Sequence, residues 1–223
     1  MNHYMDRWYT VAGLMIAMLI VAYYTSSSTL ELVATTTGLL CVWLTARENI
    51  WCWPIGLINT TCFFFMFFES KLYADMTLQI VFFLLNVQGW MIWLTKKAGS
   101  KVRPTRRMTP WMWMAAPVFI VVLTIGWGYV LTGFTDASIP YADAFIATLS
   151  IVAQILLSNK ILENWTFWII VDVLSVGMYA YKELYAVAFL YLIFLGIAVG
   201  GLYSWKKEYL EVGKRQGGIF HAR

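Results

Sequence analysis

Polar side chains interrupt several of the most apolar stretches of this chain, at spacings that place them together on helix faces. In the first half they are Asn59, Asp75, Thr77, Gln79, Asn86 and Gln88, and in the second half Gln154, Asp172, Ser175 and Tyr191. Amide groups donate and accept hydrogen bonds, and a carboxylate can accept hydroxyl groups or balance a positive charge. Because an unpaired polar group is costly in hydrocarbon, we expect these residues to face a bundle interior or a wet cavity.

In the stretch that begins at residue 72, one helix face carries three of these residues. Asp75 and Gln79 are four positions apart, and Asn86 is seven positions further on. Gln88 is rotated by about 200° from Asn86 and is a weaker member of the set. Asp75 lies near the end of its segment, where contact with water is the simpler interpretation.

In a later stretch, Trp168, Asp172 and Ser175 follow at spacings of four and three, again on one face. A carboxylate within a membrane span is a functional candidate by default, so Asp172 is the strongest single residue. Each polar residue alone could equally well hydrogen-bond a neighbouring helix. The whole set, aligned with recurring tryptophans, favours a binding pocket.

The elements that hold these residues are predicted to be transmembrane helices. The chain of 223 residues is 61% hydrophobic and 13% charged, with a mean hydropathy of +0.67, whereas a soluble domain carries roughly 25% charged residues. We predict an all-α polytopic membrane protein, a single domain over residues 1–223 in a lipid bilayer. Eight segments are long enough to cross about 30 Å of hydrocarbon: 8–24, 30–46, 51–68, 72–94, 111–131, 141–157, 165–181 and 184–205.

The positive charges fit this number of helices. Eight crossings place fourteen lysines and arginines on one side and only Lys71 and Lys182 on the other. Such residues concentrate on the cytoplasmic side of a membrane. We therefore expect both termini and the tail 206–223 in the cytoplasm. The net charge of +4 then reflects topology and indicates no nucleic-acid partner.

A duplication organises the chain. The block that starts at Glu48-Asn49 recurs 115 positions later at Glu163-Asn164, while its later landmarks lie 112 apart. This alignment pairs Trp53 with Trp168. We expect two parallel three-helix repeats, 30–94 and 141–205, joined by a linker helix 111–131, with the helix 8–24 outside the duplication.

The sequence lacks the residue patterns of several common catalytic, metal and nucleotide sites. The two histidines, His3 and His221, lie in the tails, and Cys41, Cys52 and Cys62 lack metal-ligand spacing. There is no phosphate-binding glycine loop followed by lysine. We predict no catalytic residues, no metal, no cofactor and no ATP hydrolysis by the chain itself.

Motifs in both halves resemble those of the bacterial nicotinamide riboside transporters of the PnuC family. The matching segments are Trp53-Pro54-Ile55-Gly56-Leu57-Ile58-Asn59, Leu72-Tyr73-Ala74-Asp75-Met76 with Gln79, Asn86 with Gly89-Trp90, and Asn164-Trp165-Thr166-Phe167-Trp168 with Asp172, Leu184-Tyr185 and Tyr191. The resemblance covers about residues 30–207. It implies a fold like that of the SWEET sugar transporters, here with one extra N-terminal helix, in a homo-oligomer such as a trimer. It also implies passive, alternating-access import across the bacterial inner membrane for NAD synthesis, sustained by phosphorylation of the substrate in the cytoplasm.

Together the residues and the resemblance predict a substrate-binding set of Trp53, Asn59, Gln79, Asn86, Gln88, Trp90, Gln154, Trp168, Asp172 and Tyr191. Tryptophan faces can stack on a flat cationic ring, and amides complement a carboxamide. Stacking alone does not separate nicotinamide riboside from thiamin or riboflavin, and a sugar is a further alternative. A non-transporting membrane subunit or a membrane-embedded enzyme is the alternative of a different class.

Overall fold

The computed structural model describes residues 16, 20, 23–24, 29–69, 73–95, 102–135, 138–183 and 185–220. Within these residues it has seven helices: α2 (Thr29–Ala46), α3 (Cys52–Glu69), α4 (Tyr73–Leu94), α5 (Pro110–Phe134), α6 (Pro140–Ser158), α7 (Asn164–Tyr181) and α8 (Tyr185–Phe220). The prediction of an all-helical chain is confirmed for this part. The predicted helix 8–24 lies almost wholly outside the described residues.

Six of these helices, all except α7, are long and apolar enough to cross a membrane. The helix α7 has the same length as α3 but carries Asn164, Asp172 and Ser175 along one buried face. It packs between α6 and α8. Neighbouring helices, rather than lipid, can therefore surround its polar groups.

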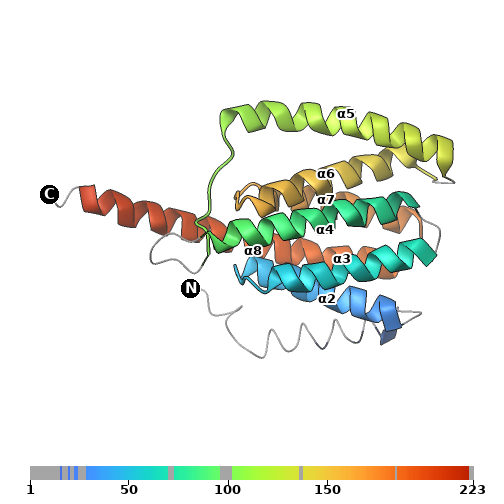
Figure 1. Cartoon of the computed structure of the whole chain (residues 1–223), viewed down its shortest axis with the longest axis horizontal. Coiled ribbons are helices and arrows are strands. Elements are labelled where there is room, and N and C mark those ends of the chain that lie inside the picture. Colours follow the sequence, from blue (N-terminus) through green and yellow to red (C-terminus); the bar gives the residue numbers. More distant parts are fainter. Residues whose placement is uncertain are drawn as a thin grey trace.

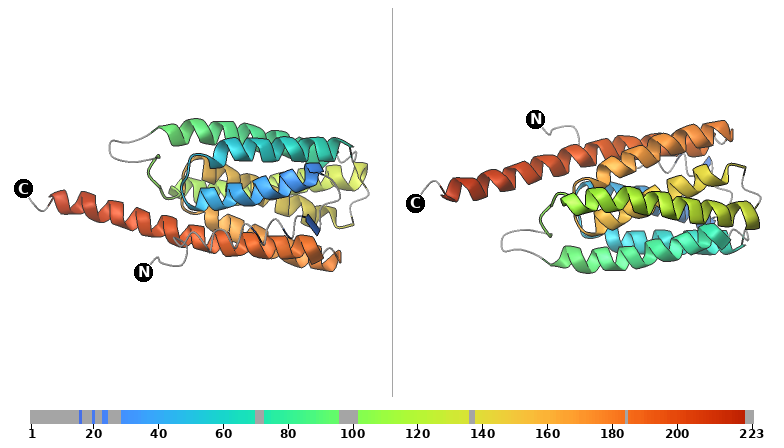
Figure 2. Two further views of the ribbon diagram at one scale, coloured as in Figure 1. Left: turned by 90° about the horizontal axis from the view of Figure 1, so that it is seen from below. Right: turned by 90° about the horizontal axis from the view of Figure 1, so that it is seen from above.

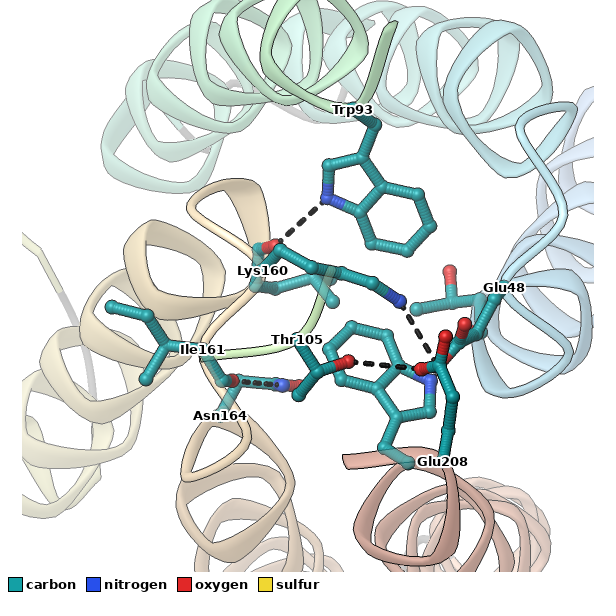
Figure 3. Close-up of polar contacts among 10 residues, drawn as sticks. Glu48, Trp93, Thr105, Lys160, Ile161, Asn164 and Glu208 are labelled. Atoms are coloured by element: carbon teal, nitrogen blue, oxygen red, sulfur yellow. Dashed lines mark hydrogen bonds and ion pairs between the residues drawn. The ribbon is translucent and has the colours of Figure 1, made fainter. Parts of the chain in front are cut away.

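Six helices form a closed ring, in the order α2, α3, α4, α6, α7 and α8, with α8 packed back against α2. Figure 3 shows helices of this ring nearly end-on around its centre. The helix α5 lies outside the ring against α6, as Figure 1 shows. Large apolar side chains on the outer surface of the bundle are exposed, among them Val118, Val122 and Ile125 of α5, as expected for a surface in contact with lipid.

Two kinds of residue mark the helix boundaries. Pro110 and Pro140 begin α5 and α6, where the missing backbone N–H of proline costs no hydrogen bond. Glu48, Lys160 and Glu183 follow α2, α6 and α7 in the left-handed conformation, with φ of 56°, 58° and 59°. Such a residue closes the end of a helix. Its conformation costs about 1–2 kcal/mol when it carries a side chain, so these turns hold charged residues at defined places.

The two halves of the ring correspond at a constant offset of 112 residues. The helices α3 and α7 begin at Cys52 and Asn164 and both contain 18 residues, and α4 and α8 begin 112 apart. The turn residues Glu48 and Lys160 keep the same offset. The 115-residue offset predicted for the start of the block is therefore wrong. Matching Glu48 to Glu163 by residue identity misaligned this part of the halves by three positions.

The last helix is longer than predicted. The apolar pattern predicts an end at Trp205, but α8 continues to Phe220 and spans about 54 Å at 1.5 Å per residue. Figures 1 and 2 show its C-terminal part projecting beyond the bundle. The predicted tail 206–223 is thus largely a continuation of the helix, because lysine and glutamate, which follow Trp205, are good helix formers.

Candidate functional site

A hydrogen-bonded pair of amides joins the two halves inside the ring. Asn86 of α4 and Gln154 of α6 are 5% and 8% exposed, and Gln154 Nε2 donates to Asn86 Oδ1 at 2.9 Å. A Cβ atom added to Gly56 of α3 would lie 3.3 Å from Asn86 Nδ2. Asn86 therefore lies where α3, α4 and α6 meet, and two of the predicted site residues are brought together.

The predicted polar face of α7 is also buried. Asp172 is 4% exposed and Ser175 is fully buried, while Trp168 is half-buried against the core. Asp172 lies close enough to Tyr191 of α8 to act on it electrostatically, and the Tyr191 ring stacks on Tyr179 with centroids 5.3 Å apart. This face thus combines a carboxylate with aromatic rings, a combination that can bind a cationic or hydroxyl-bearing molecule.

Other predicted site residues lie elsewhere. Asn59 Nδ2 donates to the carbonyl oxygen of Ala34 at 2.6 Å, so this side chain links α3 to α2. Gln88 is exposed on α4 and, from its rotation relative to Asn86, points away from the ring interior. Gln79 and Trp90 are half-buried. For Asn59 the structure favours the interhelical interpretation, and Gln88 is separate from the buried amide pair.

Four tryptophans form a line across one end of the ring. Trp53 packs edge-on against Trp93, with centroids 5.1 Å apart, and Trp93 is 5.6 Å from Trp205. Trp205 in turn packs edge-on against Trp165 at 5.5 Å. All four side chains are at most 2% exposed. Trp53 is therefore part of the packed core at this end.

The structural counterpart of Trp53 is Trp165. Each lies against a glycine of the following helix, Trp53 against Gly89 and Trp165 against Gly201. The pairing of Trp53 with Trp168 predicted from the sequence is therefore wrong. The common spacing from each tryptophan to its glycine could have revealed the correct alignment.

Sequence reasoning did not find the charged cluster at the same end of the ring (Figure 3). The Lys160 side chain is fully buried, and its Nζ lies 3.1 Å from Glu48 Oε1. The ammonium group also lies 4.3 Å from the ring centroid of Trp93 and 3.5 Å from that of Trp205. From the sequence, Lys160 is expected only as one of the fourteen positive residues on the cytoplasmic side. In the sequence, only its position 112 residues after Glu48 could have singled out Lys160.

Burial dominates the ionisation of this pair. It raises the pKa of Glu48 from 4.5 to about 7, although the nearby Lys160 favours the ionised carboxylate. It also lowers the pKa of Lys160 from 10.5, although Glu48 and Glu208 favour the ammonium form. The attraction between the two groups thus offsets only part of the cost of burying each charge.

The described residues contain no group of three or more histidine, cysteine, aspartate or glutamate side chains able to hold a metal ion. Their concentrated polar chemistry lies instead in the amide pair, the α7 face and the Glu48–Lys160 cluster.

The comparison with known families identifies the chain. The model of the family described as "Nicotinamide mononucleotide transporter" matches residues 28–207. The chain belongs to this family. It is a family of membrane transporters, not of enzymes.

Curated relatives of the chain come from several bacteria. The chain is 33% identical to the nicotinamide riboside transporter PnuC of Escherichia coli (strain K12), covering 84% of this chain and 89% of the relative. It is 26% identical to the transporter of the same name from Neisseria mucosa, covering 84% and 76%. It is also 24% identical to the riboflavin/roseoflavin transporter RibM of Streptomyces davaonensis, covering 78% and 83%.

The fold is that of a solved transporter. The crystal structure of the vitamin B3 transporter PnuC matches with a TM-score of 0.72 and 24% identity, covering 90% of this chain and 92% of that one. This similarity establishes that the chain has the helical fold of that solved transporter.

Proposed function

We propose that this protein imports nicotinamide riboside across the bacterial inner membrane by alternating access, without hydrolysing ATP. The observation that carries the proposal is the family match over residues 28–207, together with relatives from different bacteria that are named nicotinamide riboside transporters. The apolar bundle and its buried polar residues are consistent with such a role.

In the proposed architecture, the chain has eight spans, with the helix 8–24 preceding two parallel three-helix repeats, both termini in the cytoplasm, and a homo-oligomeric assembly. The constant 112-residue offset between the halves supports the repeats. The predominance of lysine and arginine on one side supports the orientation. The resemblance of the sequence motifs supports the oligomer.

The proposed binding site uses the buried polar residues of both halves. Nicotinamide riboside has a flat cationic ring, a carboxamide and sugar hydroxyls. Asn86 and Gln154 can exchange their mutual hydrogen bond for bonds to these polar groups, and Asp172 can balance the positive ring. Trp168 and Tyr191 offer aromatic faces on which the cationic ring of the substrate can stack. Gln79 and Trp90 complete the proposed set.

Riboflavin is the second candidate substrate, because the chain is also similar to RibM over most of its length. Riboflavin is flat and aromatic but carries no fixed positive charge. A site with a buried aspartate therefore favours nicotinamide riboside when the two compete.

Uptake by the purified full-length chain in proteoliposomes tests the proposal. Labelled nicotinamide riboside should enter, and an excess of unlabelled nicotinamide riboside should block entry more effectively than riboflavin or thiamin. Asn86→Ala should reduce uptake, while Gln88→Ala, which removes an amide from the opposite face of the same helix, should not. Entry of riboflavin without entry of nicotinamide riboside would assign the protein to the second candidate.

A further inference from the structure

The cluster around Lys160 joins the two halves of the ring at one end. Glu48 lies in the turn after α2 in the first half and Lys160 in the turn after α6 in the second, at corresponding positions and both in the left-handed conformation. The indole N–H of Trp93 donates to the carbonyl oxygen of Leu157, and that of Trp205 donates to the carbonyl oxygen of Thr45, 112 residues before Leu157. An ion pair and two reciprocal hydrogen bonds thus cross between the halves here.

The segment before α5 extends across the same end. The backbone N–H of Arg106 donates to the Lys160 carbonyl oxygen at 2.9 Å, and the N–H of Leu162 donates to the Arg106 carbonyl oxygen at 2.9 Å. Thr105 Oγ1 donates to Glu208 of α8 at 3.2 Å (Figure 3). This segment therefore fixes the turn that carries Lys160 and ties it to α8.

The opposite end of the ring is built differently. There Lys182, after α7, pairs with Asp143 of α6 at 2.9 Å, within one half of the chain. Both side chains are 24% exposed, whereas the Lys160 side chain is fully buried and Glu48 is 17% exposed. The end with Lys160 is thus closed by contacts between the halves, while the ion pair at the other end is partly open to solvent.

We propose that Glu48 and Lys160 are gating residues, and that their ion pair is the latch that closes this end of the ring. This inference rests on the proposed transport function. The Lys160 ammonium lies against the rings of Trp93 and Trp205, so in this proposal a molecule that leaves the ring at this end must displace the cluster. The pair must separate for this end to open. Because each buried charge depends on the other, the contact favours a fully closed or a fully open end over intermediate positions.

Cys52 provides a natural reporter of this opening. It is 1% exposed at the start of α3 and lies within electrostatic range of Lys160. A water-soluble maleimide should alkylate it slowly in the closed state. The experiment measures the rate of Cys52 alkylation by peptide mass spectrometry, without substrate, on the purified full-length chain in detergent, beside a melting curve.

Charge reversal at one position should open the latch. Glu48→Lys places a second positive charge beside Lys160, and Lys160→Glu places a second negative charge beside Glu48. The repulsion should separate the two turns, so alkylation of Cys52 should accelerate about tenfold or more in each variant. The double variant carrying both reversals should return toward the wild-type rate, because the two positions correspond in the two halves. The matched control is Lys182→Glu, the same reversal at the other end, which should leave the Cys52 rate unchanged.

If the folded single variants are alkylated at the wild-type rate, the latch is overturned. It is also overturned if the double variant is alkylated as fast as the single variants. Should the reversed chains not fold, Glu48→Gln replaces them: faster alkylation supports the latch and an unchanged rate overturns it. Calorimetry with nicotinamide riboside is done separately on the wild type. Absence of binding there would defeat the proposed function, while the alkylation rates would still decide the latch.

Discussion

At the residue scale, the amide pair Asn86–Gln154 is the most direct test of the proposed binding site. Asn86→Ala leaves the buried Gln154 amide without its partner, and we expect it to weaken nicotinamide riboside binding about tenfold, or ~1.4 kcal/mol. Gln154→Ala should weaken binding similarly. The double variant should lose less than the sum of the two, because both residues act together. Calorimetry on the purified variants measures these effects, and unchanged affinity in all three would remove the pair from the site.

The raised pKa of Glu48 predicts a pH dependence of stability. Its pKa is about 7 in the folded protein and 4.5 ordinarily, so between these values the folded protein holds a proton that the unfolded chain has released. The free energy of unfolding should therefore fall, through this group, as the pH rises from about 4.5 to 7. The charged groups that face it are Lys160, from the turn after α6, and Glu208 of α8.

Glu48→Gln cannot ionise and should flatten this part of the profile. Melting temperatures of wild type and variant, measured from pH 5 to pH 8 in one detergent, compare the two slopes. Parallel profiles would show that Glu48 keeps its ordinary pKa. The lowered pKa of Lys160 contributes the opposite slope, below 10.5, because there the unfolded chain binds the additional proton.

At the scale of elements, glycines set how closely α4 and α8 approach the tryptophans of α3 and α7. A Cβ added to Gly201 would lie 2.6 Å from the Trp165 ring, and one added to Gly89 would clash with the Trp53 ring. Gly89→Ala and Gly201→Ala should each lower stability by about 1–3 kcal/mol through overpacking. In thermal melts, both should unfold at lower temperature than wild type.

Gly196→Ala is the matched control on α8, because a Cβ at Gly196 meets nothing within 4 Å. Alanine is a better helix former than glycine, so this change should be neutral or stabilising by up to about 1 kcal/mol. A similar loss of stability in Gly196→Ala and Gly201→Ala would mean that close packing against Trp165 is not what requires glycine.

At the scale of the whole molecule, we propose that transport is passive. In this proposal the two halves rock against each other around the buried polar residues, and the sequence offers no chain of ionisable groups across the membrane to couple a gradient. We expect uptake into proteoliposomes to continue when sodium and proton gradients are collapsed with ionophores, and to stop when inside and outside concentrations are equal. Strict dependence on either gradient would contradict passive transport.

The sequence was sufficient for properties that depend on local pattern. Long apolar segments predicted the described helices to within a few residues at most ends, because helices in lipid must satisfy their own backbone hydrogen bonds. The spacing of Trp168, Asp172 and Ser175 predicted a shared face, and the structure buries Asp172 and Ser175 there. The family resemblance likewise followed from motifs within single segments.

Relations between segments were decided only by the tertiary structure. Residue identity matched Glu48 with Glu163, whereas the structure makes Lys160 the counterpart of Glu48. Both residues lie in the turn after a corresponding helix, and this position defines the correspondence between the halves, not the residue type. The same packing paired Trp53 with Trp165 and gave Asn59 a partner on α2. It also buried a lysine that hydropathy alone assigns to water. The physical reason is that a carboxylate and two indole rings, distant in sequence, meet at Lys160 only when the ring closes.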